Sequence, residues 1–257
     1  YGRLAEVVIP SVFFSVLAVY FFLGRQGRYR AGRLVLAALS FLVAVSTGWN
    51  GYFSAAAAAV IFLAYPVSSR RDLRVLGAIV ALPLLAFATH LLWAYNCGGD
   101  AQLSFLYDKF LFRSLSGGDL RYFFTASELL DVVVARMPDS TTPTLALLSL
   151  VGLASSVWRL LRRRVTPFDA VVLGLGTYWV TTILLLQNTV IIHDYFMYYP
   201  GVPFFALAAV RGLSAVASLP PRRNRSAWVL LVSVTLYFLV AQSIAAFCEH
   251  HRRAPDP

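Results

Sequence analysis

Long apolar stretches, separated by short polar or arginine-containing segments, dominate the pattern of this chain. A membrane-spanning helix needs about 20 predominantly apolar residues to cross a hydrocarbon core about 30 Å thick. Such stretches are frequent here, because hydrophobic residues make up 59% of the 257 positions. The pattern predicts an all-α, polytopic transmembrane helical bundle that forms a single domain over residues 1–257. About eight spans are expected, over residues 6–23, 33–48, 52–68, 75–95, 144–160, 168–187, 196–214 and 227–247.

Four arginine clusters predict how these spans are oriented. They hold 15 of the 22 basic residues, and two predicted spans separate each cluster from the next. Cytoplasmic loops of membrane proteins accumulate Lys and Arg. We therefore expect a multi-pass protein of the plasma (bacterial inner) membrane with all four clusters on the cytoplasmic side. The clusters are Arg25/Arg28/Arg30/Arg33, Arg70/Arg71/Arg74, Arg159/Arg162/Arg163/Arg164 and Arg211/Arg222/Arg223/Arg225.

The expectation that all arginine clusters lie on one side, with two spans between neighbouring clusters, also divides two apolar stretches that are otherwise almost continuous. Residues 34–65 are interrupted only by Gly48-Trp49-Asn50-Gly51. A single crossing here would place the first two arginine clusters on opposite sides of the membrane. Two short spans joined by a tight turn are predicted instead, because Gly and Asn supply the backbone freedom that such a turn needs. By the same argument, residues 168–215 divide at the segment 188–195.

The segment 96–143 is predicted to be an extracytoplasmic loop that carries interfacial amphipathic helices. One helix has apolar residues against Asp108 and Lys109, and Thr125 and Glu128 have the spacing of a capping box that opens a second. Such helices commonly lie along the membrane surface. Whether this loop is only a packing lid or also contacts a ligand stays open. The expected apolar faces are Leu103, Phe105, Leu106, Phe110 and Leu111, and Leu129, Leu130, Val133 and Met137.

Charge and motif content exclude several classes of function. The net charge is +10. A nucleic-acid-binding face is a continuous basic stripe, whereas here the charge gathers at the ends of predicted helices. Membrane lipid, and not nucleic acid, is therefore the expected partner. The chain has no Walker A motif, Gly-rich dinucleotide turn, H-E-x-x-H motif or nucleophile elbow. Cys97 and Cys248 are too few for a metal framework, so no metal site is predicted; whether they pair stays open.

The candidate binding residues fall into three predicted outer segments. His193, Asp194, Tyr195 and Tyr198 stand at the start of an apolar run, where ionisable groups are costly to insert and therefore suggest a site. An ordinary interfacial belt of aromatic residues is the competing interpretation. The other candidates are Trp49, Asn50 and Tyr52 in the predicted turn, and Arg113, a cation suited to a lipid phosphate; His90 is expected to be a hydrogen-bonded interhelical histidine.

Three stretches resemble the membrane-embedded glycosyltransferases of the GT-C superfamily, in the bacterial branch related to protein O-mannosyltransferases and the lipid A aminoarabinose transferase. Residues 47–53 are similar to the branch's short Trp-x-Gly-Tyr turn between two apolar spans. Residues 110–114, with Phe123 and then 143–152, resemble its outer loop returning to the membrane. Residues 193–200 and 203–209 resemble its late His/Tyr-rich segment, which enters a Pro- and Ala-rich helix.

The resemblance implies transfer of a sugar from a polyprenyl-phosphate donor to an unknown acceptor (a glycan, lipid or protein) on the extracytoplasmic face. In this superfamily an acidic residue of the first outer loop is the usual base, and no position here matches that loop. The chain begins at Tyr1, so we expect the loop to lie upstream, in a longer protein. The catalytic residues and any divalent metal stay unknown.

Two other classes of function stay open. A multispan transporter or flippase for a lipid or small solute would show discontinuous helices and often paired halves. Pro10 and Pro83 lie within predicted spans and are candidate break points, but neither has a counterpart in another half. A non-catalytic membrane scaffold is the remaining class, and the polar outer loop and the His193-Asp194 pair argue against it.

Overall fold

The protein is a bundle of helices. The computed structural model describes residues 2–24, 29–65, 72–113, 125–187 and 195–218, and scattered positions between 229 and 242. All regular structure in these ranges is helical, which confirms the all-α class. The elements are α1 (Gly2–Leu23), α2 (Arg30–Thr47), the 3-10 helix η1 (Trp49–Phe53), α3 (Ser54–Ala64), α4 (Asp72–Arg113), α5 (Ala126–Ser140), α6 (Pro143–Leu161), α7 (Pro167–Leu185) and α9 (Tyr195–Ala217).

Five of the described helices are long and apolar enough to cross a membrane. They cover Arg30–Thr47, Gly77–Leu111, Pro143–Leu161, Pro167–Leu185 and Tyr199–Val216. Two shorter apolar helices, Val8–Leu23 and Trp49–Ala64, coincide with predicted spans. With its 11 residues, α3 reaches only about 16 Å at 1.5 Å per residue, which is less than the hydrocarbon thickness. The predicted span 227–247 lies mostly outside the described residues.

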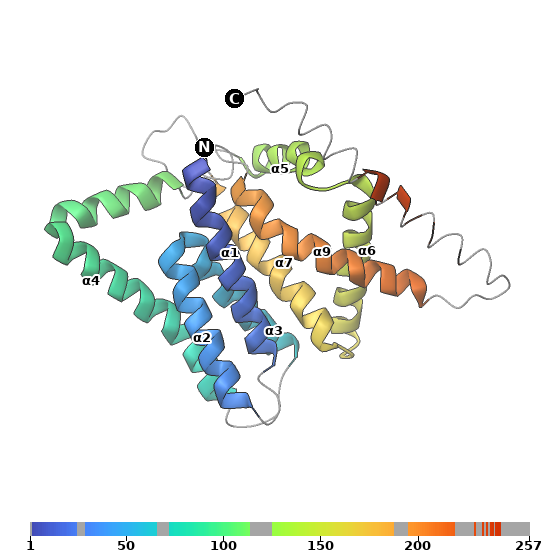
Figure 1. Ribbon diagram of the computed structural model, residues 1–257, viewed down its shortest axis with the longest axis horizontal. Coiled ribbons are helices and arrows are strands. Elements are labelled where there is room, and N and C mark those ends of the chain that lie inside the picture. The colour runs from blue at the N-terminus through green and yellow to red at the C-terminus, as the bar shows by residue number, and fades with distance from the viewer. Residues whose placement is uncertain are drawn as a thin grey trace.

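The helices form two packed groups that meet along α3 and α7 (Figure 1). In the first group α1 packs against α2, and in the second α6 and α7 pack against α9. The largest buried cluster joins the groups, since it contains Phe22 of α1, Ile61 of α3, Leu175 and Tyr178 of α7 and Phe204 of α9. Helix α4 begins beside the first group, leads away from it and then turns back at an elbow (Figure 1).

Two glycines bring α6 and α9 into unusually close contact. A Cβ atom at Gly152 would collide with the backbone carbonyl of Ala208, and one at Gly212 would collide with that of Leu148. Small residues at such crossings let transmembrane helices approach each other, where dispersion and interhelical hydrogen bonds replace the hydrophobic effect. One such bond joins the Ser149 hydroxyl to the carbonyl of Phe205 at 2.9 Å.

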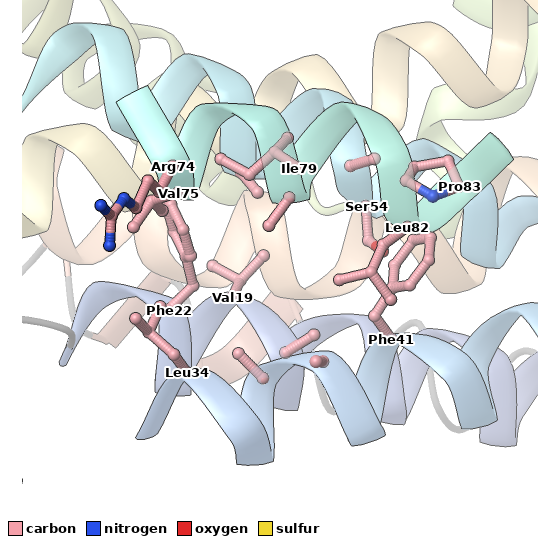
Figure 2. A pocket seen from close by; sticks show the side chains of 16 residues that line it. Val19, Phe22, Leu34, Phe41, Ser54, Arg74, Val75, Ile79, Leu82 and Pro83 are labelled. Carbon is pink, nitrogen blue, oxygen red and sulfur yellow. The ribbon is translucent and has the colours of Figure 1, made fainter. Parts of the chain in front are cut away.

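The predicted reversal of the chain at 48–51 is present. Gly48 ends α2, and η1 leads directly into α3. In Figure 2, Leu34 lies at one end of α2's contact with α4, whereas Phe41 and Ser54 lie at the other. The chain therefore travels along α2, turns at η1 and returns along α3.

Helix α5 begins with the predicted capping box. The Glu128 backbone N–H donates to the Thr125 hydroxyl at 3.3 Å, and the Thr125 backbone N–H donates to the Glu128 carboxylate at 2.6 Å. The Thr125 hydroxyl also donates to this carboxylate, at 2.9 Å, and the bonds from the Thr125 backbone and side chain lower the pKa of Glu128. Leu129 is buried, while Val133 and Met137 pack against buried clusters. Leu130 is 60% exposed, so it packs less against the protein than the other residues of the predicted apolar face.

Candidate functional site

A cavity of about 580 Å³ lies where the η1 turn faces the middle and the far end of α4. Ligand sites in proteins commonly enclose about 300–1,000 Å³ and combine apolar walls with a few polar groups. This cavity has that character. From the α1–α2–η1 side its walls are Val8, Val45, Ser46, Thr47, Gly48, Trp49, Asn50 and Tyr52; from α4 they are Phe87, His90, Leu91, Leu103, Leu106, Tyr107 and Phe110.

The turn that carries Trp49, Asn50 and Tyr52 is anchored on one carbonyl group, that of Ala44. This oxygen accepts the Gly48 backbone N–H at 3.1 Å and the Ser11 hydroxyl of α1 at 3.0 Å. Gly51 packs directly on the same peptide group, where a Cβ atom would clash with the backbone. The glycine on which the turn prediction rested is thus required by close packing. The result is a rigid base for the cavity.

Asn50 is the most deeply buried polar residue of the cavity wall, with 1% of its surface exposed. Its Nδ2 donates to the Tyr178 hydroxyl of α7 at 3.4 Å, while its Oδ1 has no hydrogen-bond partner among the described residues. The buried Tyr52 hydroxyl is likewise without a described partner. A buried polar group left unpaired costs about 1–3 kcal/mol. Such groups call for an explanation, and a ligand that donates and accepts hydrogen bonds supplies one.

Aromatic rings form much of the remaining wall. Trp49 and Phe110 lie with ring centroids 5.6 Å apart and planes inclined by 30°. Tyr52 meets Phe87 edge to face at 6.2 Å. These pairs connect the turn to α4 on both sides of its elbow. Together with Asn50, they suit a ligand that has both apolar faces and hydroxyl groups.

The elbow in α4 brings the far part of this helix back over the cavity. Gly99 has φ 61° and ψ −149°, a conformation open essentially to glycine alone. Helical structure continues past residue 95, where the predicted span ends, to this break and then beyond it to Arg113, so the first part of the predicted loop is helical. The predicted amphipathic helix is present, with Leu103, Leu106 and Phe110 on the cavity side; Phe105 is 52% exposed.

The remaining predicted site residues are only partly described. Arg113 ends α4 three residues after Phe110, and its side chain lies outside the description. His193 and Asp194 also lie outside the described residues. Tyr195 and Tyr198 belong to the first turns of α9, again without described side chains.

Helix α7 links the turn to the start of α9 through two consecutive residues. Tyr178 contacts Asn50, and the Trp179 indole N–H donates to the carbonyl of Met197 at 3.0 Å. Two of the three predicted outer segments, the turn and the His/Tyr-rich segment, thus approach one helix.

Sequence reasoning missed Tyr178 and misassigned His90. Tyr178 is fully buried, and its contact with Asn50 joins residues 128 positions apart, which no local pattern indicates. The predicted interhelical hydrogen bond of His90 is absent among the described residues; instead its ring meets Trp93 edge to face at 6.2 Å and lines the cavity. His90 stands one helical turn after Phe87, and this spacing was the signal in the sequence that both residues line the same cavity. Cys97 is a free, exposed thiol, whereas Cys248 lies outside the described residues.

Within the described part of the chain, no three His, Cys, Asp or Glu side chains are grouped so as to hold a metal ion. Comparisons with protein families, with curated proteins and with solved structures find no match to this chain. The resemblance to GT-C transferases therefore rests on the sequence motifs alone.

Proposed function

We propose that this chain is the membrane-embedded part of a glycosyltransferase that uses a polyprenyl-phosphate-linked sugar, and that the cavity beside η1 binds the donor. The observation that carries the proposal is that Asn50 and Tyr52, two residues of the aromatic cavity wall, each have a buried polar atom without a described hydrogen-bond partner. A sugar donates and accepts hydrogen bonds through its hydroxyls and presents apolar faces to rings such as Trp49. The three motifs that resemble the GT-C branch agree with this assignment.

The donor phosphate requires a cation, because negative charge develops on it as the sugar leaves. Arg113 is our candidate: it stands three residues after Phe110, and residues with this spacing lie on neighbouring positions of one helix face. His193 is a second candidate, on the segment that precedes α9. Among the residues that the structure describes, none of those lining the cavity carries a carboxylate. We therefore assign to this site the binding and orientation of the donor, and no catalytic base.

We further propose eight spans with the arginine-rich ends in the cytoplasm. Arg74, at the start of α4, lies beside the end of α1 and the start of α2 (Figure 2). Arg159 of α6 and Arg211 of α9 both approach Asp169 at the start of α7. The arginine-bearing ends of α6 and α9 thus meet at the start of α7, and we assign them and Arg74 to the same, cytoplasmic side, as the positive-inside rule expects. The donor cavity then faces the extracytoplasmic side.

The alternative of a transporter has one supporting observation, the interruption of α4 at Gly99. Transporter helices break near the middle of the membrane. Gly99 stands 22 residues after Gly77, where the candidate span begins, which is about 33 Å along the helix. This distance exceeds the hydrocarbon thickness. The position of the break favours a segment that returns along the membrane surface, as the transferase proposal expects.

The test is sugar transfer by the full-length protein in proteoliposomes. Radiolabelled polyprenyl-phosphate mannose, glucose, arabinose and aminoarabinose serve as donors, and transfer to the lipid-extractable and glycan fractions is measured. We expect one donor to be consumed by the wild type and the rate to fall at least ten-fold in Asn50→Leu. The matched control is Asn96→Leu, because Asn96 is exposed and outside the cavity. Equal rates in both variants would contradict the assignment of the site.

A further inference from the structure

A second cavity, of about 320 Å³, lies between the first half of α4 and the helices α1, α2 and α3 (Figure 2). Its walls are apolar apart from Ser54 and Arg74. Small side chains leave the space open: the lining includes Ala18, Ala37, Ala38, Ala55, Ala58 and Ala78. The groove is separate from the candidate donor site, with which it shares no lining residue.

Helix α4 gains little burial from the rest of the protein. Only 6% of its candidate span is buried, against 50% for the span of α7. On the outward side of α4, Leu84 and Leu85 are each 65% exposed and are expected to face lipid. The groove therefore lies between a helix surrounded by lipid and the body of the bundle. A membrane-derived occupant can reach it from the hydrocarbon core.

The size and chemistry of the groove exclude several occupants. Its lining offers almost no hydrogen bonds, so burial of a polar ligand there is costly. A helix about 10 Å wide that followed the groove from Arg74 to Pro83 would occupy about 1,000 Å³, far more than the space present. A methylene group takes up about as much space as a water molecule, roughly 30 Å³. The volume corresponds to about ten carbons of a flexible chain.

One end of the groove is cationic. Arg74 leaves the first turn of α4 at this end, and its guanidinium extends past Phe22 and Val75 (Figure 2). Arg74 is exposed, and no described acidic side chain pairs with it. Arg33, which directly precedes the lining residue Leu34, lies at the same end, where it donates to the carbonyl of Gly24 at 3.2 Å.

We propose that this groove binds one acyl chain of an anionic phospholipid, whose phosphate pairs with Arg74. The apolar walls hold the chain, and the guanidinium forms charge-assisted hydrogen bonds with the phosphate oxygens. The lipid belongs to the leaflet at the arginine-rich ends of the helices and fills the space between α4 and the bundle. The expected preference for anionic over zwitterionic headgroups is about five-fold, the equivalent of the ~1 kcal/mol that each basic residue contributes near an anionic surface.

The experiment counts lipids that stay bound to the purified protein. The full chain is placed in nanodiscs of equal parts phosphatidylglycerol and phosphatidylcholine, released into mild detergent and examined by native mass spectrometry. The wild type is expected to retain one lipid, with phosphatidylglycerol favoured about five-fold. In Arg74→Gln the lipid stays but this preference falls to about one. In Ala78→Phe, which fills the groove from α4, the retained lipid is lost.

Matched variants separate the groove from general effects. Ala81→Phe adds the same ring at an exposed position of α4 outside the groove, and Arg162→Gln removes an arginine of another cluster. Both should retain lipid as the wild type does. Ala58→Leu fills the groove from α3, and thermal unfolding checks that each variant is folded. Retention of the lipid in the folded Ala78→Phe and Ala58→Leu variants, or an unchanged preference in Arg74→Gln, would overturn the proposal.

Discussion

Two arginines approach the same buried carboxylate from different helices, and their contributions to stability should differ strongly. Asp169, at the start of α7, is fully buried. Arg211 of α9 donates to it from Nε at 2.6 Å and is only 12% exposed, whereas Arg159 of α6 is 3.7 Å away and 41% exposed. The carboxylate also accepts the backbone N–H of Thr166 at 2.9 Å and the Ser156 hydroxyl at 3.2 Å. These two partners remain when either arginine is removed.

The magnitudes follow from burial. Removal of one partner of a buried ion pair typically costs about 3–5 kcal/mol, because the other charge stays buried without compensation. The Thr166 hydroxyl also donates to Asp169, at 2.6 Å, and the three remaining hydrogen bonds place Arg211→Gln near the lower end, at about 3 kcal/mol. An exposed ion pair is worth about 0–1 kcal/mol, so Arg159→Gln should cost less than 1 kcal/mol. We therefore predict that Arg211→Gln lowers the free energy of unfolding several times more than Arg159→Gln does.

Equilibrium unfolding in mixed micelles of dodecyl maltoside and sodium dodecyl sulfate, followed by tryptophan fluorescence, measures both free energies of unfolding. Asp169→Asn and its combination with Arg211→Gln complete a double-mutant cycle. We expect a coupling energy of about 2 kcal/mol or more between Asp169 and Arg211. Similar losses for the two arginine variants, or additive effects of Asp169→Asn and Arg211→Gln, would refute the reasoning.

Three further predictions follow from single positions. Gly212→Val should cost at least 3 kcal/mol of stability, because the backbone of α6 leaves no room for a side chain, while Gly77→Ala, in open space, should stabilise by up to ~1 kcal/mol in the same unfolding assay. Gly99→Ala should cost about 1–3 kcal/mol and straighten α4, which spin labels on its two halves would report as a longer distance. The pKa of Glu128 is lower in the folded protein than in the unfolded chain, so its ionised form stabilises α5. Protection of α5 from hydrogen exchange should be full above the unfolded-state pKa, about 4.3, and should fall as the pH drops through the pKa of the folded state. Glu128→Gln should remove this dependence on pH.

The sequence predicted features that depend on local chemistry or on membrane topology. Reversal of the chain at Gly48 to Gly51 followed from placing the arginine clusters before and after it on the same side of the membrane. Hydropathy alone shows one long apolar stretch here. The capping box at Thr125 and Glu128 followed from spacing, because its bonds join residues three apart. In both cases a few residues determine the local structure without knowledge of distant contacts.

The features that sequence could not predict depend on which helix faces meet. In a membrane both the lipid-facing and the protein-facing sides of a helix are apolar, so hydrophobic periodicity does not distinguish them. In α7, Tyr178 is fully buried while Leu184 is 49% exposed. The contact of Tyr178 with Asn50, and that of Arg211 with Asp169, join residues 128 and 42 positions apart. An amphipathic helix after residue 95 was predicted, but its direct continuation from the span was not, because Gly98-Gly99 has the composition of a helix end.

The claim that the cavity beside η1 binds a sugar donor rests on two buried polar atoms, Asn50 Oδ1 and the Tyr52 hydroxyl, that make no described hydrogen bond and therefore do not stabilise the fold. The most direct test is Tyr52→Phe, with Tyr20→Phe as a control because Tyr20 is 66% exposed. Unfolding stability and binding of polyprenyl-phosphate mannose in nanodiscs are measured for both variants. We predict that Tyr52→Phe leaves stability unchanged or raises it by up to ~1 kcal/mol while it weakens donor binding about 2- to 10-fold, the worth of one hydrogen bond. A loss of stability with unchanged donor binding would show that this hydroxyl serves the fold, and would contradict the account.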